Sequence, residues 1–465
     1  MVRADATIRV LGVASTVREL ARATPADRDR TVDLLRAASI LVVVFGHWTM
    51  AALEQKPSGF EATNVLALTP RAWLITWLLQ VMPVFFLVGG FSNAVVLQKR
   101  PALARFYATR LERLLAPTIV LAGAFISIGV VWKLIPGLDQ KLNREVTRIV
   151  AQPLWFLGIY LLAILAGPLT YRLHDRNRTT TLAALGASAL VVDGLRIGLD
   201  RPGLGYFNFV FVWVFAHQLG YWLHDGWFDR QHPRRHCLIA VASLGVMVAL
   251  CASGKYPGSM VGLPGEESNL NPPSAMLLFH AIWMASLVAL ARPALARWCA
   301  RERNWMLVIA ANSMIMTIFL WHLPALVAGA GVLLGIGKLD VEPATLTWWL
   351  WRPAWYVLLL GFLVPLVVLL RRFEQPRWSP PAALNDRFRD SSALATVGVV
   401  LALWGLLGWS LVGFGRLTEW PATHLLGVPI NTLSSTICVL CGSALTKLST
   451  HVRDRRPTER KAVRG

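Results

Sequence analysis

Long apolar blocks separated by short polar stretches run through the chain, and this pattern predicts membrane-spanning helices. The blocks at 34–53, 72–97, 115–135 and 154–171 each approach the roughly 20 residues that an α-helix needs to cross a hydrocarbon core. Similar blocks recur towards the C-terminus, and 55% of the 465 residues are hydrophobic whereas only 15% are charged. A soluble protein of this length needs more polar residues to cover its surface. We therefore expect an all-α polytopic membrane protein.

The distribution of positive charge predicts how the chain is oriented in the membrane. The formal net charge is +20, but Lys and Arg gather in every second loop between the apolar blocks. This is the positive-inside pattern of membrane proteins, and it argues against a nucleic-acid partner. We expect a multi-pass protein of the cell's inner (plasma) membrane with both termini in the cytoplasm. The Gly- and Pro-rich stretch 254–273 is then an irregular outer loop.

The same alternation predicts a division of the chain along its length. A basic cytoplasmic segment at 1–31 precedes a transmembrane unit of about ten spans at 32–372. A proline-containing cytoplasmic linker at 373–390 leads to two additional transmembrane helices within 391–447, and a basic cytoplasmic tail occupies 448–465. No internal sequence repeat accompanies these roughly twelve spans.

Two residues in the first span are the leading candidates for chemistry, because ionisable side chains are costly in hydrocarbon and are therefore candidate functional residues. Arg36 and His47 are eleven positions apart, which returns to nearly the same helical face and separates them by roughly 16 Å along the axis. Histidine titrates near neutral pH and can act as a general base towards a hydroxyl or an amine. The alternative is that His47 only bonds a neighbouring helix and Arg36 snorkels to the headgroups.

Three other charged residues are candidates for substrate contacts. Arg110 and Arg113 are three positions apart just before the third predicted span, where two guanidinium groups on one helical face could grip phosphates. An ordinary positive-inside anchor is the alternative. Glu54 follows His47 by two helical turns, so it could contact an acceptor from the same face or merely snorkel at the outer end of the span.

The remaining titratable residues in apolar segments are expected to be structural. His217 and His280 are interpreted as packing histidines, and Asp193 is expected to pair with Arg196 near an outer helix end. The five cysteines are scattered, mostly in apolar segments, and are interpreted as small buried hydrophobic residues. The sequence has no Gly-rich nucleotide loop and no Cys/His metal-ligand spacing, so we expect no metal and no permanently bound cofactor.

Five segments of the chain, taken in order, resemble the motifs of the acyltransferase family 3 integral membrane proteins. Each segment alone is weakly specific, but the five together, spread over 31–326, are specific, and the resemblance covers roughly residues 31–372. The segments are TVDLLRAASILVVVFGHWTM with Arg36 and His47, PVFFLVGGFSNA with a Gly-Phe turn, FYATRLERLLAP, PLWFLGIYLLAIL and NSMIMTIFLWHLPAL.

The resemblance implies transfer of an acetyl or other acyl group, usually from acyl-CoA, often onto a surface or secreted glycan. Family members often end after ten spans or continue into an extracytoplasmic esterase-like domain, whereas this chain adds two spans, so any partner transferase would be another membrane chain. The functional positions that the resemblance carries over are Arg36, His47, Arg110 and Arg113, together with Trp155 and His322 as groove residues.

These observations predict a membrane O-acyltransferase that uses acyl-CoA, with acetyl-CoA foremost, as a co-substrate. In this hypothesis Arg110 and Arg113 hold the CoA phosphates, Arg36 guides the pantetheine, and His47 deprotonates a hydroxyl or amine of a cell-envelope glycan, glycolipid or related acceptor. The competing hypothesis is a transporter or flippase of a lipid-linked sugar, which discontinuous spans in two related halves would indicate. A structural scaffold would need no ionisable groups on one face of the first span.

Overall fold

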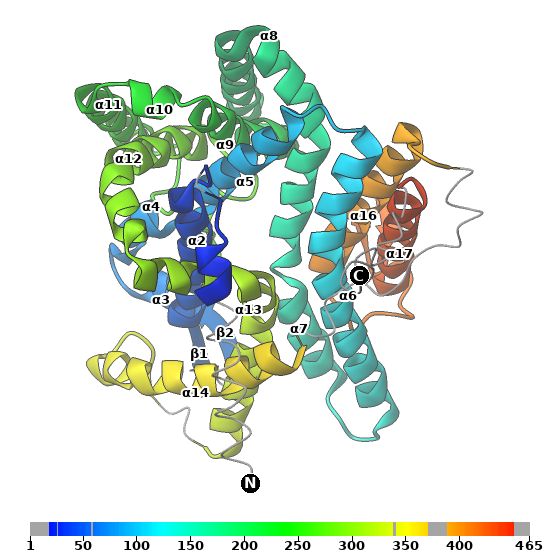
Figure 1. Cartoon of the computed structure of the whole chain (residues 1–465). Coiled ribbons are helices and arrows are strands. Elements are labelled where there is room, and N and C mark those ends of the chain that lie inside the picture. The colour runs from blue at the N-terminus through cyan, green and yellow to red at the C-terminus, as the bar shows by residue number, and fades with distance from the viewer. Residues whose placement is uncertain (1–17, 26, 57–58, 338–340, 371–387, 451–465) are drawn as a thin grey trace, which may run out of the picture. The chain divides into compact units, whose positions relative to one another are not determined.

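The computed structural model describes residues 18–25, 27–56, 59–337, 341–370 and 388–450, without the side chains of 53–62. Helices form most of this part of the chain, and its strands make two short antiparallel hairpins, β1–β2 and β3–β4 (Figure 1). Nine helical segments of the described residues are long and apolar enough to cross a membrane. The prediction of an all-α polytopic membrane protein is confirmed.

The helices group into two compact units, each of which combines segments that are distant in sequence. Unit 1 consists of Met1–Gln98 and Ala166–Phe373, and unit 2 of Lys99–Leu165 and Glu374–Gly465. Both units contribute to the long helix α8 (Leu154–Gly198), which crosses from one to the other at residue 165.

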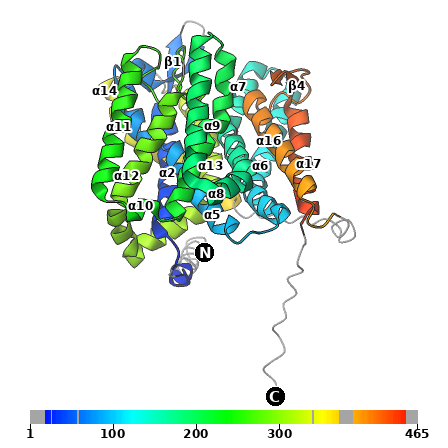
Figure 2. The same ribbon diagram turned by 90° about the horizontal axis from the view of Figure 1, so that it is seen from above.

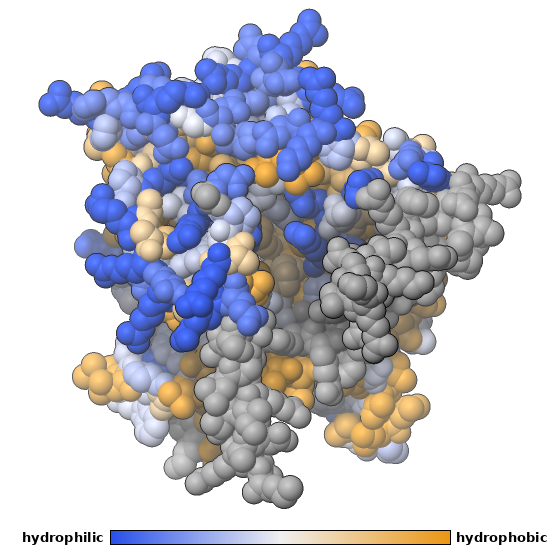
Figure 3. Space-filling view, in the orientation of Figure 1, coloured by the Kyte–Doolittle hydropathy of each residue, from blue (hydrophilic) through white to orange (hydrophobic). Residues whose placement is uncertain are grey.

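Unit 1 is built around helix α2, which contacts α5, α12 and α13 (Figures 1 and 2). Hydrophilic residues gather over α10 and α11 on the face shown in Figure 3. The helices of unit 1, besides the second part of α8, are α2 (Arg30–Met50), α3 (Val65–Leu68), α4 (Ile75–Leu79), α5 (Met82–Leu97), α9 (Asn208–His224), α10 (Trp227–Arg230), α11 (Pro233–Ala252), α12 (Ala275–Ala300), α13 (Glu302–Gly335) and α14 (Leu346–Leu370), with short 3-10 turns at Ala72–Leu74 and Pro202–Phe207.

The predicted first span extends beyond the C-terminal end of the observed helix α2. Helix α2 stops at Met50, and strand β1 (Ala51–Lys56) begins at once and pairs with β2 (Gly59–Asn64). Glu54 therefore lies on a strand, opposite Glu61, and the predicted helical face shared by Glu54 and His47 is wrong. Helix propensity alone favours continuation through this Ala-Ala-Leu-Glu stretch, but the hairpin supplies partners for its backbone groups. The side chain of Glu54 lies outside the described residues.

The polar, basic stretch after the apolar block at 154–171 forms no long loop, because α8 consists of two helices that join at a single non-helical residue. Asn177 has extended backbone angles (φ −159°, ψ 95°) inside the helix. Its side-chain oxygen accepts a hydrogen bond from the backbone N–H of Thr180 at 3.0 Å. An asparagine that caps the second half of the helix satisfies the orphan donor that the break creates, so a longer loop is not needed.

The Gly-Phe turn expected at the end of the second span is also not a turn, since α5 continues to Leu97. Gly90 lies where α5 meets α9, and a Cβ atom there would come within 1.9 Å of the carbonyl oxygen of His217. On the other helix, a Cβ atom at Gly220 would come within 2.0 Å of the carbonyl oxygen of Leu87. The two glycines therefore allow backbone-to-backbone contact, which is how small residues bring membrane helices together.

The loop 254–273, which is predicted to lie outside, is irregular as expected, and hydrogen bonds hold it against neighbouring residues. The Asn269 amide donates to the carbonyl oxygens of Pro257 and Ser259 at 2.6 and 2.9 Å. Asp193 pairs with Arg196 at 2.9 Å, as predicted, and also accepts from the Tyr256 hydroxyl at 2.8 Å. Burial, together with this carboxylate, raises the pKa of Tyr256 above its usual range.

Unit 2 contains α6 (Leu103–Leu134), α7 (Gln140–Ala151), the start of α8, α16 (Ser392–Val412) and α17 (Thr432–Leu448), with β3 (Thr423–Leu425) and β4 (Val428–Ile430). Helices α16 and α17 both pack on α6 and cross each other through small residues (Figure 2). A Cβ atom at Gly405 would lie 2.5 Å from the carbonyl oxygen of Ser435. The two C-terminal helices are thus part of a packed unit.

Candidate active site

Two histidines that are 275 positions apart form the centre of the candidate site. His47 lies in the last turn of α2 and His322 lies within α13, and their Nδ1 and Nε2 atoms are 2.8 Å apart. The rings are inclined by only 11°, with centroids 5.1 Å apart. The N–N distance plus two ring radii accounts for this separation, so the hydrogen bond lies close to the plane of both rings.

The hydrogen-bond partners define which nitrogen of each ring carries a proton. Nδ1 of His322 lies 2.5 Å from the carbonyl oxygen of Phe319, and a carbonyl oxygen only accepts. Nδ1 of neutral His322 is therefore the donor and its Nε2 carries the lone pair. His47 must then donate from Nδ1, which leaves the lone pair of neutral His47 on Nε2.

The two rings differ in exposure. His322 is completely buried, whereas His47 is partly exposed. His47 does bond a neighbouring helix, as the alternative to catalysis holds, but this bond uses only one of its ring nitrogens. The arrangement presents a lone pair from a fixed ring, backed by a second ring that cannot itself reach solvent. This is the geometry of an oriented general base.

A tryptophan next to His47 links α2 to α13 by a hydrogen bond beside the histidine pair. The indole N–H of Trp48 donates to the backbone carbonyl of His322 at 2.9 Å, and Trp48 has no exposed surface. Since this bond uses the backbone of His322, it is independent of the His322 side chain. The contact fixes the axial position of α2 relative to α13, and with it the distance between the two rings.

Arg36 is held near the start of α2 by two partners within the protein. Its guanidinium group donates to Asp33 at 2.9 Å and to the hydroxyl of Ser92, on α5, at 2.6 Å. Asp33 also accepts from Arg28 at 2.6 Å, so one buried carboxylate serves two arginines. The snorkelling alternative requires a side chain that extends freely towards the headgroups. The side chain of Arg36 is instead 28% exposed and is bonded within the protein.

The predicted donor-binding residues lie in unit 2. Arg110 and Arg113 lie within α6, on a helix as expected, and the guanidinium of Arg110 lies over the ring of Phe106 at 5.5 Å. Arg113 is exposed, and Trp155, at the start of α8, is partly buried with its ring edge against Phe156. Their roles towards a CoA donor stay predictions.

One ionisable residue near the histidine pair was missed in the sequence. Arg352, on α14, is only 8% exposed and contacts the end of α2. The signal for it was present, because an arginine within a predicted span is a candidate functional residue. Several tryptophans surround Arg352 in the sequence, so the segment was interpreted as part of a headgroup belt and Arg352 was not selected as a candidate.

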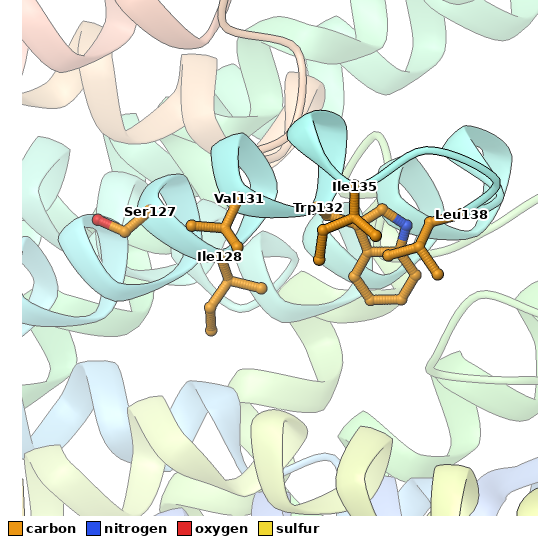
Figure 4. A pocket seen from close by; sticks show the side chains of 6 residues that line it. All are labelled: Ser127, Ile128, Val131, Trp132, Ile135 and Leu138. Atoms are coloured by element: carbon orange, nitrogen blue, oxygen red, sulfur yellow. The ribbon is translucent and has the colours of Figure 1, made fainter.

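An apolar pocket of about 300 Å³ lies along the C-terminal part of α6 and the loop after it (Figure 4). Its lining contains no titratable side chain and none of the predicted site residues, so it offers apolar contact rather than chemistry. The lining residues are Ser127, Ile128, Val131, Trp132, Ile135 and Leu138.

Comparison with known protein families gives one match. Residues 29–372, well over half of the chain, match the family model described as an acyltransferase domain, Acyl_transf_3. A search for similar curated proteins found no match, and a search for similar solved structures found none either. The matched range contains both histidines of the pair as well as Arg36, Arg110 and Arg113.

Proposed function

Since the chain belongs to acyltransferase family 3 and is a membrane acyltransferase, we propose that it transfers an acetyl or other acyl group from acyl-CoA to a hydroxyl or amine of a cell-envelope acceptor. A glycan, a glycolipid or a related molecule would serve as the acceptor, with O-acyl transfer as the reaction. The observation that carries this proposal is the hydrogen-bonded pair of His47 and His322. In the proposed orientation both termini lie in the cytoplasm of an inner (plasma) membrane protein.

In the first step His47 acts as the general base. The acceptor hydroxyl gives its proton to Nε2 of His47 while its oxygen forms a bond to the carbonyl carbon of the thioester. The resulting imidazolium keeps its Nδ1–H bond to His322, and that bond strengthens as His47 becomes charged. His322 therefore stabilises the charge that develops during the attack.

In the second step the tetrahedral intermediate collapses. The carbon–sulfur bond breaks, the CoA sulfur leaves as a thiolate, and the imidazolium of His47 returns the proton to it. The products are the acylated acceptor and the free CoA thiol, and His47 is again neutral with its lone pair on Nε2. No covalent acyl-enzyme is required in this sequence.

The arginines are assigned to donor binding in this proposal. Arg110 and Arg113 would hold the CoA phosphates, for which guanidinium groups are the fitting partners. Arg36 would guide the pantetheine arm towards His47, which stands roughly 16 Å further along α2. Support comes from the way Asp33 and Ser92 fix the Arg36 side chain at one position.

The test is His47→Gln, which keeps polarity and approximate size but removes the titratable nitrogen. Transfer of a labelled acyl group by the purified, reconstituted variant should fall about 10²- to 10⁴-fold, the usual worth of a general base. His280→Gln is the matched control, because His280 is a fully buried histidine in the same unit that bonds the carbonyl of Trp77, and it should stay active. Wild-type turnover in well-inserted His47→Gln would refute the base assignment, whereas no acyl transfer by the wild-type protein itself would favour the transporter hypothesis.

The substrates themselves can be named by mass. Glycans and lipids from a deletion strain should lack one acyl mass that wild-type cells carry, and complementation with the wild-type gene should restore it. The missing mass identifies the acyl group, and the molecule that lacks it identifies the acceptor. Unchanged acylation of every envelope glycan and lipid would contradict the proposed acceptor class.

A further inference from the structure

A buried arginine contacts the end of the helix that carries His47. Arg352 lies on α14, and its Nη1 and Nη2 atoms donate to the backbone carbonyl oxygens of Trp48 and Ala51 at 3.4 and 3.3 Å. Its guanidinium group also lies 3.2 Å from the ring centre of Trp348. Among the residues whose side chains are described, no carboxylate forms an ion pair with Arg352. A cation placed this way in an apolar helix is costly, so Arg352 is a candidate functional residue.

The contacts of Arg352 supply hydrogen-bond donors and positive charge at the C-terminus of α2. The last carbonyl groups of a helix have no partners within the helix and form the negative end of its dipole. Helix α2 ends at Met50, and the backbone N–H of Ala51 donates to the carbonyl of His47. Arg352 supplies donors and a positive charge to the carbonyl groups beyond it. The indole N–H of Trp355, also on α14, donates to the carbonyl of Trp48 at 3.2 Å.

His47 lies within this last turn, so its position is defined from two sides. Helix α13 holds side chains, since His322 bonds the ring of His47 and the His322 carbonyl bonds the indole of Trp48. Helix α14 holds the backbone through the carbonyl of Trp48, one residue from His47. If the contacts from α14 are removed, the last turn of α2 can fray or shift, because only the contacts from α13 still hold it.

We propose that Arg352 is a positioning residue that holds the last turn of α2 and thereby aims the His47 ring at the acceptor. The inference rests on the proposed role of His47 as the base. A displacement of about 1 Å at a reacting group typically costs on the order of 10²-fold in rate. Arg352→Met keeps the length of the side chain without its donors or charge, so we expect kcat to fall about 10- to 100-fold. The donor KM should be unchanged, because the loss is in geometry rather than in substrate binding.

Two milder variants separate positioning from folding. Arg352→Lys keeps the charge but not the paired donors, and it should restore part of kcat. Trp355→Phe keeps the ring and removes one N–H donor to the carbonyl of Trp48, and it should lower kcat about 2- to 10-fold, the worth of one neutral hydrogen bond. Trp351→Phe is the matched control, because Trp351 is 62% exposed on the same helix, and it should behave as wild type.

The deciding measurement is Arg352→Met in the His47→Gln background. If Arg352 acts through the base, removing it from protein that already lacks the base should not lower the residual rate further. An equal fold-loss in both backgrounds, or a raised acceptor KM at unchanged kcat, would overturn the proposal. If Arg352→Met does not insert, wild-type kcat in both Arg352→Lys and Trp355→Phe would overturn it. Failure of the proposed base role of His47 is seen separately, as wild-type turnover in His47→Gln alone.

Discussion

Replacing His322 by leucine removes the ring that accepts the Nδ1–H of His47, and it leaves the rest of the contact between α2 and α13 in place. Trp48 bonds the backbone carbonyl of residue 322, so that tie survives the substitution. His322→Gln serves as the conservative partner, because its amide oxygen can accept from His47 and its NH₂ group can donate to the carbonyl of Phe319. The pair of variants therefore distinguishes a missing acceptor from a disturbed fold.

The size of the effect follows from the charge that His47 acquires during the reaction. A hydrogen bond between neutral groups contributes about 0.5–1.5 kcal/mol, and one to a charged group about 1.5–3 kcal/mol. The difference, about 1–1.5 kcal/mol, is realised only when His47 is protonated, and it corresponds to about tenfold in rate. Loss of the fixed tautomer and ring orientation adds to this, so kcat for His322→Leu should fall about 10- to 100-fold.

The assay is acyl transfer from a labelled acyl donor by purified protein in liposomes, with kcat and both KM values measured and rates normalised to inserted protein. We expect a lower kcat with unchanged donor KM in His322→Leu, and substantial recovery in His322→Gln. Wild-type kcat in His322→Leu would refute the role of His322 as the acceptor for His47. Equal losses in the leucine and glutamine variants would show that the ring is needed for packing rather than for its lone pair.

Three further predictions address the rest of the chain. Arg110→Ala should raise the apparent donor KM and Arg110→Lys should restore it only partly, because a point charge lacks the guanidinium fork; an unchanged donor KM would leave the membrane anchor as the better account. A cysteine placed at Gly262 in a cysteine-free variant should be labelled from outside intact cells, and labelling only after permeabilisation would reverse the topology. Gly405→Val should lower the thermal stability of the detergent-solubilised protein without changing the rate per folded molecule, since any Cβ there meets the carbonyl of Ser435 at 2.5 Å, and an unaltered melting temperature would contradict the tight crossing of α16 and α17.

The sequence alone predicted the architecture well, because the bilayer restricts what a spanning segment can be. Hydrocarbon admits backbone only when its polar groups are paired within the segment, so long apolar blocks had to be helices. The same cost made Arg36 and His47 candidates before any contact was known. Local details were not predicted where local geometry overrides hydropathy: the strand that follows Met50, the helix that continues through the Gly-Phe motif to Leu97, and the single-residue break at Asn177.

By itself, the sequence therefore determined that the chain spans a membrane and is helical. It also supplied the family motifs and individual candidates such as His47 and His322. Only the tertiary structure placed those two rings in one hydrogen bond across 275 positions and set their tautomers through the carbonyl of Phe319. It also revealed Arg352 at the end of α2. The physical reason is that apolarity is a property of each segment, whereas helix pairing depends on side-chain shape and on hydrogen bonds between segments, which no periodicity encodes.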